Sequence, residues 1–200
     1  MQLGKVVKSN SHCDYVVQLD DVLAVASPPQ PDDYGFGCFV KLSIPHKPWV
    51  VGLIYDSQLL NPQFASPGPR LSAEPDLLFT PDLVGETRTL LWTLLIGTLE
   101  TVQGRCYGVQ GIPQSVVPVN TLVYRMSPQE VYQFHLNPQQ RPQFCYYGHL
   151  LRCGGSFAAE LTQRVLQDLV GSDLFSSVDQ RALAVLCKEL TWRNTMAAMR

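Results

Sequence analysis

The sequence contains few charged side chains, and they do not gather in any one segment. Lys, Arg, Asp and Glu make up 16% of the 200 residues, with 15 basic and 17 acidic side chains and a net charge of −2. Proteins that bind nucleic acids usually concentrate Lys and Arg on one surface or in one segment. No run of Lys or Arg occurs here, so a nucleic acid is disfavoured as a ligand.

A long hydrophobic run is also lacking. The most apolar stretch, residues 89–99, has about half the length that a membrane-spanning helix needs. The first ten residues lack the apolar core of a secretory signal. These absences predict a cytoplasmic protein that does not insert into a membrane. Apolar residues make up 46% of the chain, which excludes disorder. With so little charge, the folded protein is expected to cover part of its apolar surface with a partner.

The six cysteines do not have the spacing of a disulfide framework. They are widely and irregularly placed in a chain long enough to fold without disulfides, which favours reduced thiols. Cys145, His149 and Cys153 follow one another at four-residue intervals and could share a helix face as metal ligands. No C-x-x-C pair and no fourth ligand lies nearby, so ordinary buried thiols are favoured and no metal site is predicted.

Motifs for catalysis are nearly absent. The chain has no phosphate-binding loop of the form G-x-x-x-x-G-K-[ST], and the GFG at residues 35–37 predicts only a turn. Residues 154–158, GGSFA, are one residue short of the nucleophile elbow G-x-S-x-G. An elbow follows a buried strand, and the preceding residues make a marginal one, so Ser156 is predicted to cap a helix. A hydrolase that uses Ser156 with His149 or His135 stays open as an alternative, and no cofactor is predicted.

The first 126 residues have the pattern of short strands separated by Gly, Pro, Asp and Asn. In residues 36–44, Phe36, Val40 and Leu42 fall on one apolar face, while Phe39 interrupts the polar face. Residues 49–56 follow a short link and are predicted to pair with residues 36–44 in antiparallel fashion. The predicted strands are residues 3–9, 14–19, 21–26, 36–44, 49–56, 87–100 and 120–126. The longest is apolar on both faces, which predicts a central strand with a bend at Gly97.

Beyond residue 126 the pattern is helical. Ser127, Pro128 and Glu130 have the spacing of a capping box with proline in the first turn. Two further helices are predicted after the capping residues Ser156 and Ser177. The second helix of the three places its apolar residues four apart, and this stripe consists of Phe157, Leu161, Val165 and Leu169.

These elements predict an α+β fold, a small closed antiparallel β-barrel of about six strands followed by a C-terminal helical segment. Two domains are expected. Residues 1–126 would form the barrel, and residues 127–200 a helical extension packed on or beside it.

The connection between residues 61 and 81 is unusually long for a compact domain, and such loops are commonly functional. It contains five prolines and several apolar side chains. One interpretation is a loop packed over one end of the barrel, and the other is an arm that binds a partner. The candidate partner-binding residues in this segment are Phe64, Arg70, Leu71, Leu78 and Phe79.

The order and punctuation of the strands resemble a known family. The matching features are Gly4-Lys5-Val6 near the start, Val40 ending a strand, Val51-Gly52 followed by Tyr55-Asp56, Gly97 in a long apolar strand, and the closing strand at residues 118–123. Over residues 1–150 the chain is similar to the HAS-barrel family, the N-terminal β-barrel of HerA-type DNA translocases and rotary ATP synthase subunits. In those translocases a short strand, here residues 146–151, leads into the motor domain.

The resemblance implies a barrel that serves in assembly, because in ring ATPases these barrels form a collar and dock other proteins. The chain has no phosphate loop where the motor would follow, so no catalytic residue is carried over. We therefore predict a non-enzymatic protein-interaction or assembly module, with an ATPase complex or a second copy of the chain as partner. A small hydrolase and a weak nucleic-acid-binding OB-like barrel are the alternatives.

Overall fold

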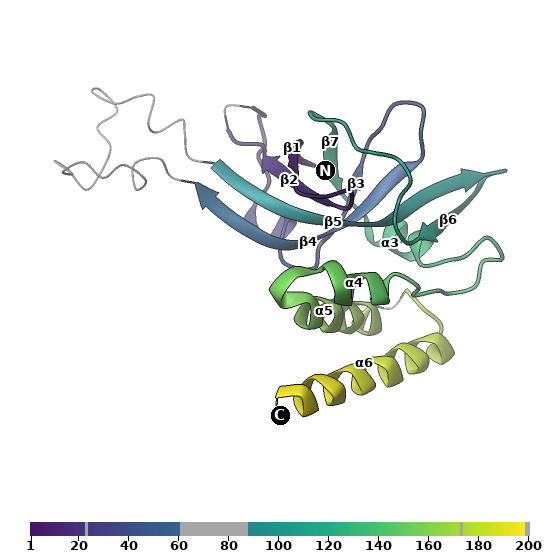
Figure 1. Cartoon of the computed structure of the whole chain (residues 1–200). Coiled ribbons are helices and arrows are strands. Elements are labelled where there is room, and N and C mark those ends of the chain that lie inside the picture. Colours follow the sequence, from purple (N-terminus) through teal and green to yellow (C-terminus); the bar gives the residue numbers. More distant parts are fainter. Residues whose placement is uncertain (23, 61–87, 173, 199–200) are drawn as a thin grey trace, which may run out of the picture.

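A closed barrel of six antiparallel strands, with a seventh strand beside it, forms the first part of the chain. The computed structural model describes residues 1–22, 24–60, 88–172 and 174–198, the last six by their backbone alone. The strands are β1 (Gln2–Ser9), β2 (Asp14–Leu19), β3 (Phe39–Leu42), β4 (Trp49–Leu60), β5 (Arg88–Val102), β6 (Arg105–Gln110) and β7 (Leu122–Arg125). They lie in the order β2-β1-β7-β3-β4-β5-β6, and β2 also pairs with β5. This last pairing closes the barrel and leaves β6 outside it (Figure 1), so the predicted fold class is confirmed.

The long strand β5 makes closure possible because it pairs with two strands, β2 and β6, along the same edge. Its residues 90–94 pair with β2, and its residues 97–102 pair with β6. The second stretch begins at Gly97, which has φ of 155° and lies opposite a register shift in β4. A Cβ atom at this position would come within 2.4 Å of the Val109 carbonyl oxygen. The irregularity predicted at Gly97 therefore marks the point where β5 changes partners.

Most of the predicted strands are present in the structure. However, β4 extends to Leu60, past the predicted end at residue 56, and β6 was not among the predicted strands. The described residues 21, 22 and 24–26 do not form a strand, because the backbone N–H of Ala24 is held by both the carbonyl and the carboxylate of Asp21 in a turn. The predicted strand 36–44 is shortened to β3, since Phe36 and Gly37 lie in a turn. The antiparallel pairing of β3 with β4 is confirmed.

The described part of the chain contains four α-helices, all of which follow the barrel strands in sequence. They are α3 (Pro128–Phe134), α4 (Tyr147–Cys153), α5 (Ala158–Gly171) and α6 (Ser177–Ala198), with the short 3₁₀ turns η1 (Pro31–Asp33) and η2 (Gly155–Phe157). In Figure 1, α4 and α5 lie directly beneath the barrel and α6 lies beyond α5. The segment 146–151, which the family resemblance predicts to be a strand, is instead largely helix α4. None of the described helices is both long enough and apolar enough to span a lipid bilayer.

The barrel and the helices share one hydrophobic core. Val40 and Leu42 point into the barrel and are fully buried. Phe39, on the opposite face of the same strand, is also buried, and its ring contacts Phe134 and Tyr146. The interruption of the polar face at Phe39 thus marks where the helices cover the barrel. Because the core is continuous, the division into two domains at residue 126 stays a prediction.

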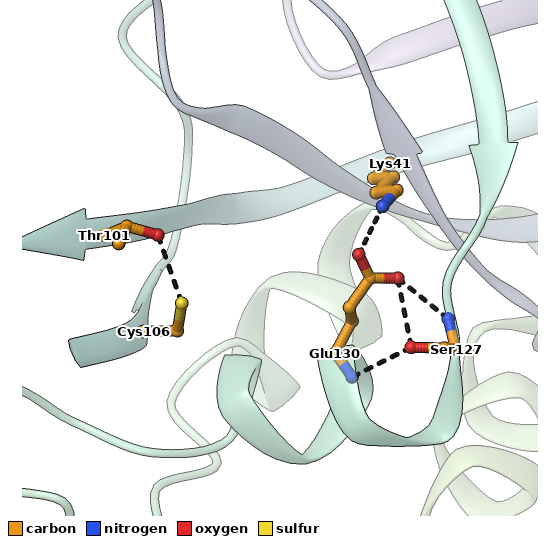
Figure 2. Close-up of polar contacts among 5 residues, drawn as sticks. All are labelled: Lys41, Thr101, Cys106, Ser127 and Glu130. Atoms are coloured by element: carbon orange, nitrogen blue, oxygen red, sulfur yellow. Dashed lines mark hydrogen bonds and ion pairs between the residues drawn. The ribbon is translucent and has the colours of Figure 1, made fainter. Parts of the chain in front are cut away.

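The capping box that begins α3 also ties this helix to the barrel (Figure 2). The N–H of Glu130 donates to Ser127 Oγ at 3.3 Å, and the N–H of Ser127 donates to Glu130 Oε2 at 2.9 Å. The other carboxylate oxygen of Glu130 accepts from the Lys41 ammonium group of β3. Burial alone would raise the pKa of Glu130, but the hydrogen bonds from Lys41 and Ser127 lower it below its ordinary value. Figure 2 also shows the Thr101 hydroxyl beside the Cys106 thiol in the β5–β6 hairpin.

The other two capping predictions were wrong. At the start of α5 the N-cap residue is Phe157, without a side-chain cap, because η2 displaces the helix start past Ser156. At the start of α6 the hydroxyl of Ser176, not Ser177, accepts from the N–H of Asp179. In both places the helix pattern is correct and the capping residue is displaced by one position.

We expect Ser127→Ala to lower the free energy of unfolding by about 1 kcal/mol, because the substitution leaves the N–H of Glu130 without its acceptor. The matched control is Ser156→Ala, which removes an exposed hydroxyl that caps no helix and should change the stability by less than about 0.5 kcal/mol. Urea denaturation followed by circular dichroism measures both. Equal losses in the two variants would contradict the capping assignment.

Candidate functional site

The candidate partner-binding residues of the long loop cannot be placed. The loop at residues 61–81 lies outside the described part of the chain, so its role in partner binding stays a prediction. The residues concerned are Phe64, Arg70, Leu71, Leu78 and Phe79.

The serine and histidine of the hydrolase alternative do not meet in the described residues. Ser156 is exposed, and it forms no hydrogen bond with either histidine in the part of the chain that the structure describes. His135 is 1% exposed, and its Nδ1–H donates to the Val131 carbonyl at 2.7 Å. Its Nε2 therefore accepts from the hydroxyl of Tyr146, at 2.8 Å. Burial lowers the pKa of His135 to about 4, and the neutral ring is a structural group of the core.

His149 is also engaged within the fold. Its Nε2–H donates to the Leu95 carbonyl at 3.0 Å, and burial lowers its pKa below the ordinary value. Cys145 precedes α4 and Cys153 ends it, and both thiols are exposed rather than buried. All six cysteines are free, as predicted. No group of three metal-binding side chains occurs within the described ranges.

A pocket of about 480 Å³ lies where the turn before β3 meets β4 and the start of α5. Aromatic side chains from these three parts of the chain line it, together with Pro31 and Ile54. We call it the aromatic pocket, and its defining residues are Tyr34, Phe36, Tyr55 and Phe157. The sequence does not indicate this site, because its residues come from positions more than a hundred apart in the chain.

Two phenylalanines form the exposed part of this pocket. The rings of Phe36 and Phe157 lie edge to face, with centroids 6.3 Å apart. Phe36 is 41% exposed and Phe157 is 49% exposed. Both were predicted to face the core, Phe36 on a strand and Phe157 on a helix stripe. The structure places Phe36 in the turn between Gly35 and Gly37 and Phe157 before the first turn of α5, so neither side chain reaches the core.

The turn that carries Phe36 is pinned to β4. The N–H of Gly37 donates to the Ile54 carbonyl at 2.8 Å, and the N–H of Ile54 donates to the Cys38 carbonyl at 3.0 Å. Gly37 adopts φ of 84°, a conformation that favours glycine. These bonds hold the turn in one place, so Phe36 extends over the pocket from a rigid support.

Tyr55 forms the floor of the pocket. It is the extra residue at a register shift in β4, where Ile54 pairs with Thr93 and Asp56 with Trp92. Its hydroxyl donates to Asp14 Oδ1 at 2.8 Å, and burial followed by this hydrogen bond raises the pKa of Tyr55 above its ordinary value.

Gly155 packs against the ring of Tyr55. A Cβ atom at this glycine would lie 3.3 Å from Tyr55 Cε2, and its φ of 69° also favours glycine. The GGSFA segment therefore brings Phe157 up against β4, which gives this elbow-like sequence a structural role.

The pocket carries negative charge at its lining. Asp56 and Glu160 belong to the lining, and no Lys or Arg does so among the residues that the structure describes. An apolar cavity with carboxylates at its edge is suited to a ligand that combines an apolar group with a positive charge.

Two further pockets are less suited to be the site. The groove between α5 and α6, of about 620 Å³, is lined mainly by apolar side chains that include Trp192. The third pocket, of about 480 Å³, lies where the barrel meets α3 and α5. Its cations Lys41 and Arg125 are already engaged in ion pairs. Because the aromatic pocket combines exposed rings with carboxylates on one edge, it is the candidate functional site.

The buried histidine makes the stability of the protein depend on pH. The pKa of His135 is about 4 in the folded protein, whereas an ordinary histidine has a pKa near 6.5. The folded state disfavours protonation, so its stability is fully present above about pH 6.5 and decreases as the pH falls toward 4. We expect this residue alone to lower the free energy of unfolding by on the order of 3 kcal/mol across that range.

The measurement compares urea unfolding of the wild type and of His135→Gln at pH 7, 6 and 5. The glutamine variant cannot take up this proton, so its stability should fall less steeply with decreasing pH. His46→Gln, which alters an exposed histidine in a turn, should follow the wild type. Parallel pH profiles for wild type and His135→Gln would show that the buried ring does not cause the effect.

Comparison with known proteins places the chain in a protein family. No curated protein matches the chain at a significant level. A family model described as "Domain of unknown function (DUF8166)" matches residues 1–200. Because the match spans the whole sequence, the chain belongs to the DUF8166 family.

Proposed function

We propose that this protein is a non-enzymatic interaction or assembly module that binds a segment of another protein in the aromatic pocket. The observation that carries this proposal is the pair of exposed phenylalanines, Phe36 and Phe157, held over an apolar cavity by rigid elements. Large exposed aromatic side chains grouped at a concave site are typical of protein-binding surfaces.

The energetics support such a role. Full burial of a phenylalanine contributes roughly 1.5–3 kcal/mol. Phe36 and Phe157 are each about half exposed, so covering both would contribute on the order of 2 kcal/mol. Little side-chain entropy is lost on binding, because the two rings already contact each other and the turn beneath Phe36 is held by backbone hydrogen bonds.

The HAS-barrel resemblance supports the same proposal and suggests its context. In ring ATPases such barrels dock partner proteins, so we propose an ATPase complex as the partner, with a second copy of this chain as the other candidate. The acidic edge of the pocket disfavours nucleic acid, whose phosphates would be repelled.

The test replaces Phe157, whose ring is exposed, with a residue that should leave the fold intact. Phe157 occupies the N-cap position of α5 and has no capping hydrogen bond. Serine is among the preferred N-cap residues, so Phe157→Ser should fold with unchanged or slightly raised stability. We expect this variant to lose bound partners that the wild type retains when tagged proteins are isolated from their native cells and compared by quantitative mass spectrometry.

The control is Ile112→Ser, which removes a side chain that is 59% exposed outside the pocket lining. It should retain the same partners as the wild type. The proposal is wrong if wild type, Phe157→Ser and Ile112→Ser recover identical proteins in equal amounts. Light scattering of the purified wild type and Phe157→Ser determines whether the partner is a second copy.

A further inference from the structure

Among the residues that the structure describes, no strand pairs with the outer edge of β4 beyond Ile54, beside the aromatic pocket. We call this stretch the open edge. Strand β3 pairs with residues 50–53 of β4, and the turn before β3 continues this pairing to Ile54. Beyond that point, residues 56–60 pair with β5 on the opposite edge, and no described strand pairs with the outer one. Figure 1 shows the ends of β4 and β5 side by side as a two-stranded ribbon.

The backbone groups on this open edge can be assigned from the register. Ile54 directs its N–H and carbonyl toward the turn before β3. One extra residue, Tyr55, follows, and from Asp56 to Leu60 the pairing with β5 is regular. Hydrogen-bonding direction alternates along an antiparallel strand, so Ser57 and Leu59 point their backbone groups to the open edge.

A side-chain contact supports this assignment. The N–H of Ser57 donates to the carboxylate of its own neighbour Asp56, at 2.8 Å. A carboxylate in this position occupies a donor that a partner strand would otherwise use. Leu59 is 75% exposed and Leu60 is 41% exposed, so apolar side chains accompany the open backbone groups.

The open edge and the aromatic pocket are contiguous, because Asp56 and Ser57 belong to both. An extended chain that lies along this edge would therefore pass the pocket and could place one side chain in it. A helix satisfies its own backbone groups and would not use the Ser57 carbonyl or the backbone groups of Leu59. Strand addition, in contrast, uses both the edge and the pocket.

We infer that the ligand of this site is an extended segment of a partner protein that adds as a strand to the outer edge of β4. It places an aromatic or aliphatic side chain in the aromatic pocket and a Lys or Arg beside Asp56 and Glu160. This inference rests on the proposed function and names its binding mode. A second copy of the same edge is disfavoured as the occupant, because it would bring Asp56 of both copies close together.

The test begins with a displayed library of random nine-residue peptides. Peptides are selected on the wild-type protein and rejected if they also bind Phe157→Ser. We expect the selected peptides to contain an aromatic or aliphatic residue with Lys or Arg close by in the sequence. Glu160→Lys should lower the affinity of these peptides tenfold or more. Replacing the peptide's basic residue with Glu should restore much of the affinity for this variant.

Backbone pairing is tested separately with N-methylated versions of the tightest peptide. A strand donates hydrogen bonds to its neighbour from every second residue. Methylation at alternate positions should therefore weaken binding tenfold or more, and methylation at the positions between should have little effect.

A matched pair of protein variants tests the same edge from the other side. Leu59→Pro removes an N–H that points outward, and proline is tolerated on an open edge, so the variant should fold. Leu59→Thr removes the same side chain and keeps the N–H. We expect tenfold or greater loss of peptide affinity in Leu59→Pro relative to Leu59→Thr, with circular dichroism as the check on folding.

The following outcomes distinguish a failure of the strand-addition inference from a failure of the proposed function. If selected peptides require Phe157 but bind as helices, or tolerate methylation at every position, strand addition is wrong and the interaction site remains. If no peptide that requires Phe157 is found while native partners still depend on that residue, a short extended segment is not the ligand. If Phe157 is instead required for dimerisation of the purified protein, the occupant is a second copy and the inference is overturned.

Discussion

The packing of a few aromatic rings between the barrel and the helices is the contact on which the rest of this structure depends. Phe39 points outward from β3, and its ring lies 5.5 Å from that of His135 and 6.5 Å from that of Tyr146. Polar groups buried this deeply are costly unless they are paired. The bonds from His135 to Val131 and from Tyr146 to His135 provide the pairing, so the helices can bury these polar groups against the barrel.

Docking of the helices in turn creates the aromatic pocket. Helix α4 and the turn η2 carry the chain from this interface to β4, where Gly155 packs against Tyr55. Phe157 then meets Phe36, which approaches from the opposite side on the turn before β3. Neither the barrel alone nor the helices alone would form the cavity. A loss of packing at Phe39 would therefore affect the site as well as the stability of the fold.

The arrangement of the barrel also explains why one edge is open. β5 is longer than its neighbours, and β4 follows it beyond the point where β3 ends. Closed barrels remove the edges of a sheet. Among the described residues, β6 lies outside the closed barrel, and β4 and β5 extend past the other strands. The open stretch carries exposed leucines and a single carboxylate, which contrasts with the lysines and prolines that commonly protect an edge. Its position beside the pocket supports the proposal that the two features belong to one protein-binding surface.

Local patterns in the sequence were sufficient to predict the barrel class, most of its strands and the capping box of α3, because alternation and capping depend on residues close together in the chain. The predictions for Phe36 and Phe157 were wrong, since a local pattern does not show which face of an element another element covers. Phe39 is the clearest example. In the sequence it interrupts the alternation of polar and apolar residues, and only the docked helices explain why an apolar residue stands there. The strand that the family resemblance implied at residues 146–151 is largely helix α4. The aromatic pocket and the open edge of β4 were decided by tertiary structure alone, because they arise where segments distant in sequence meet or stop pairing.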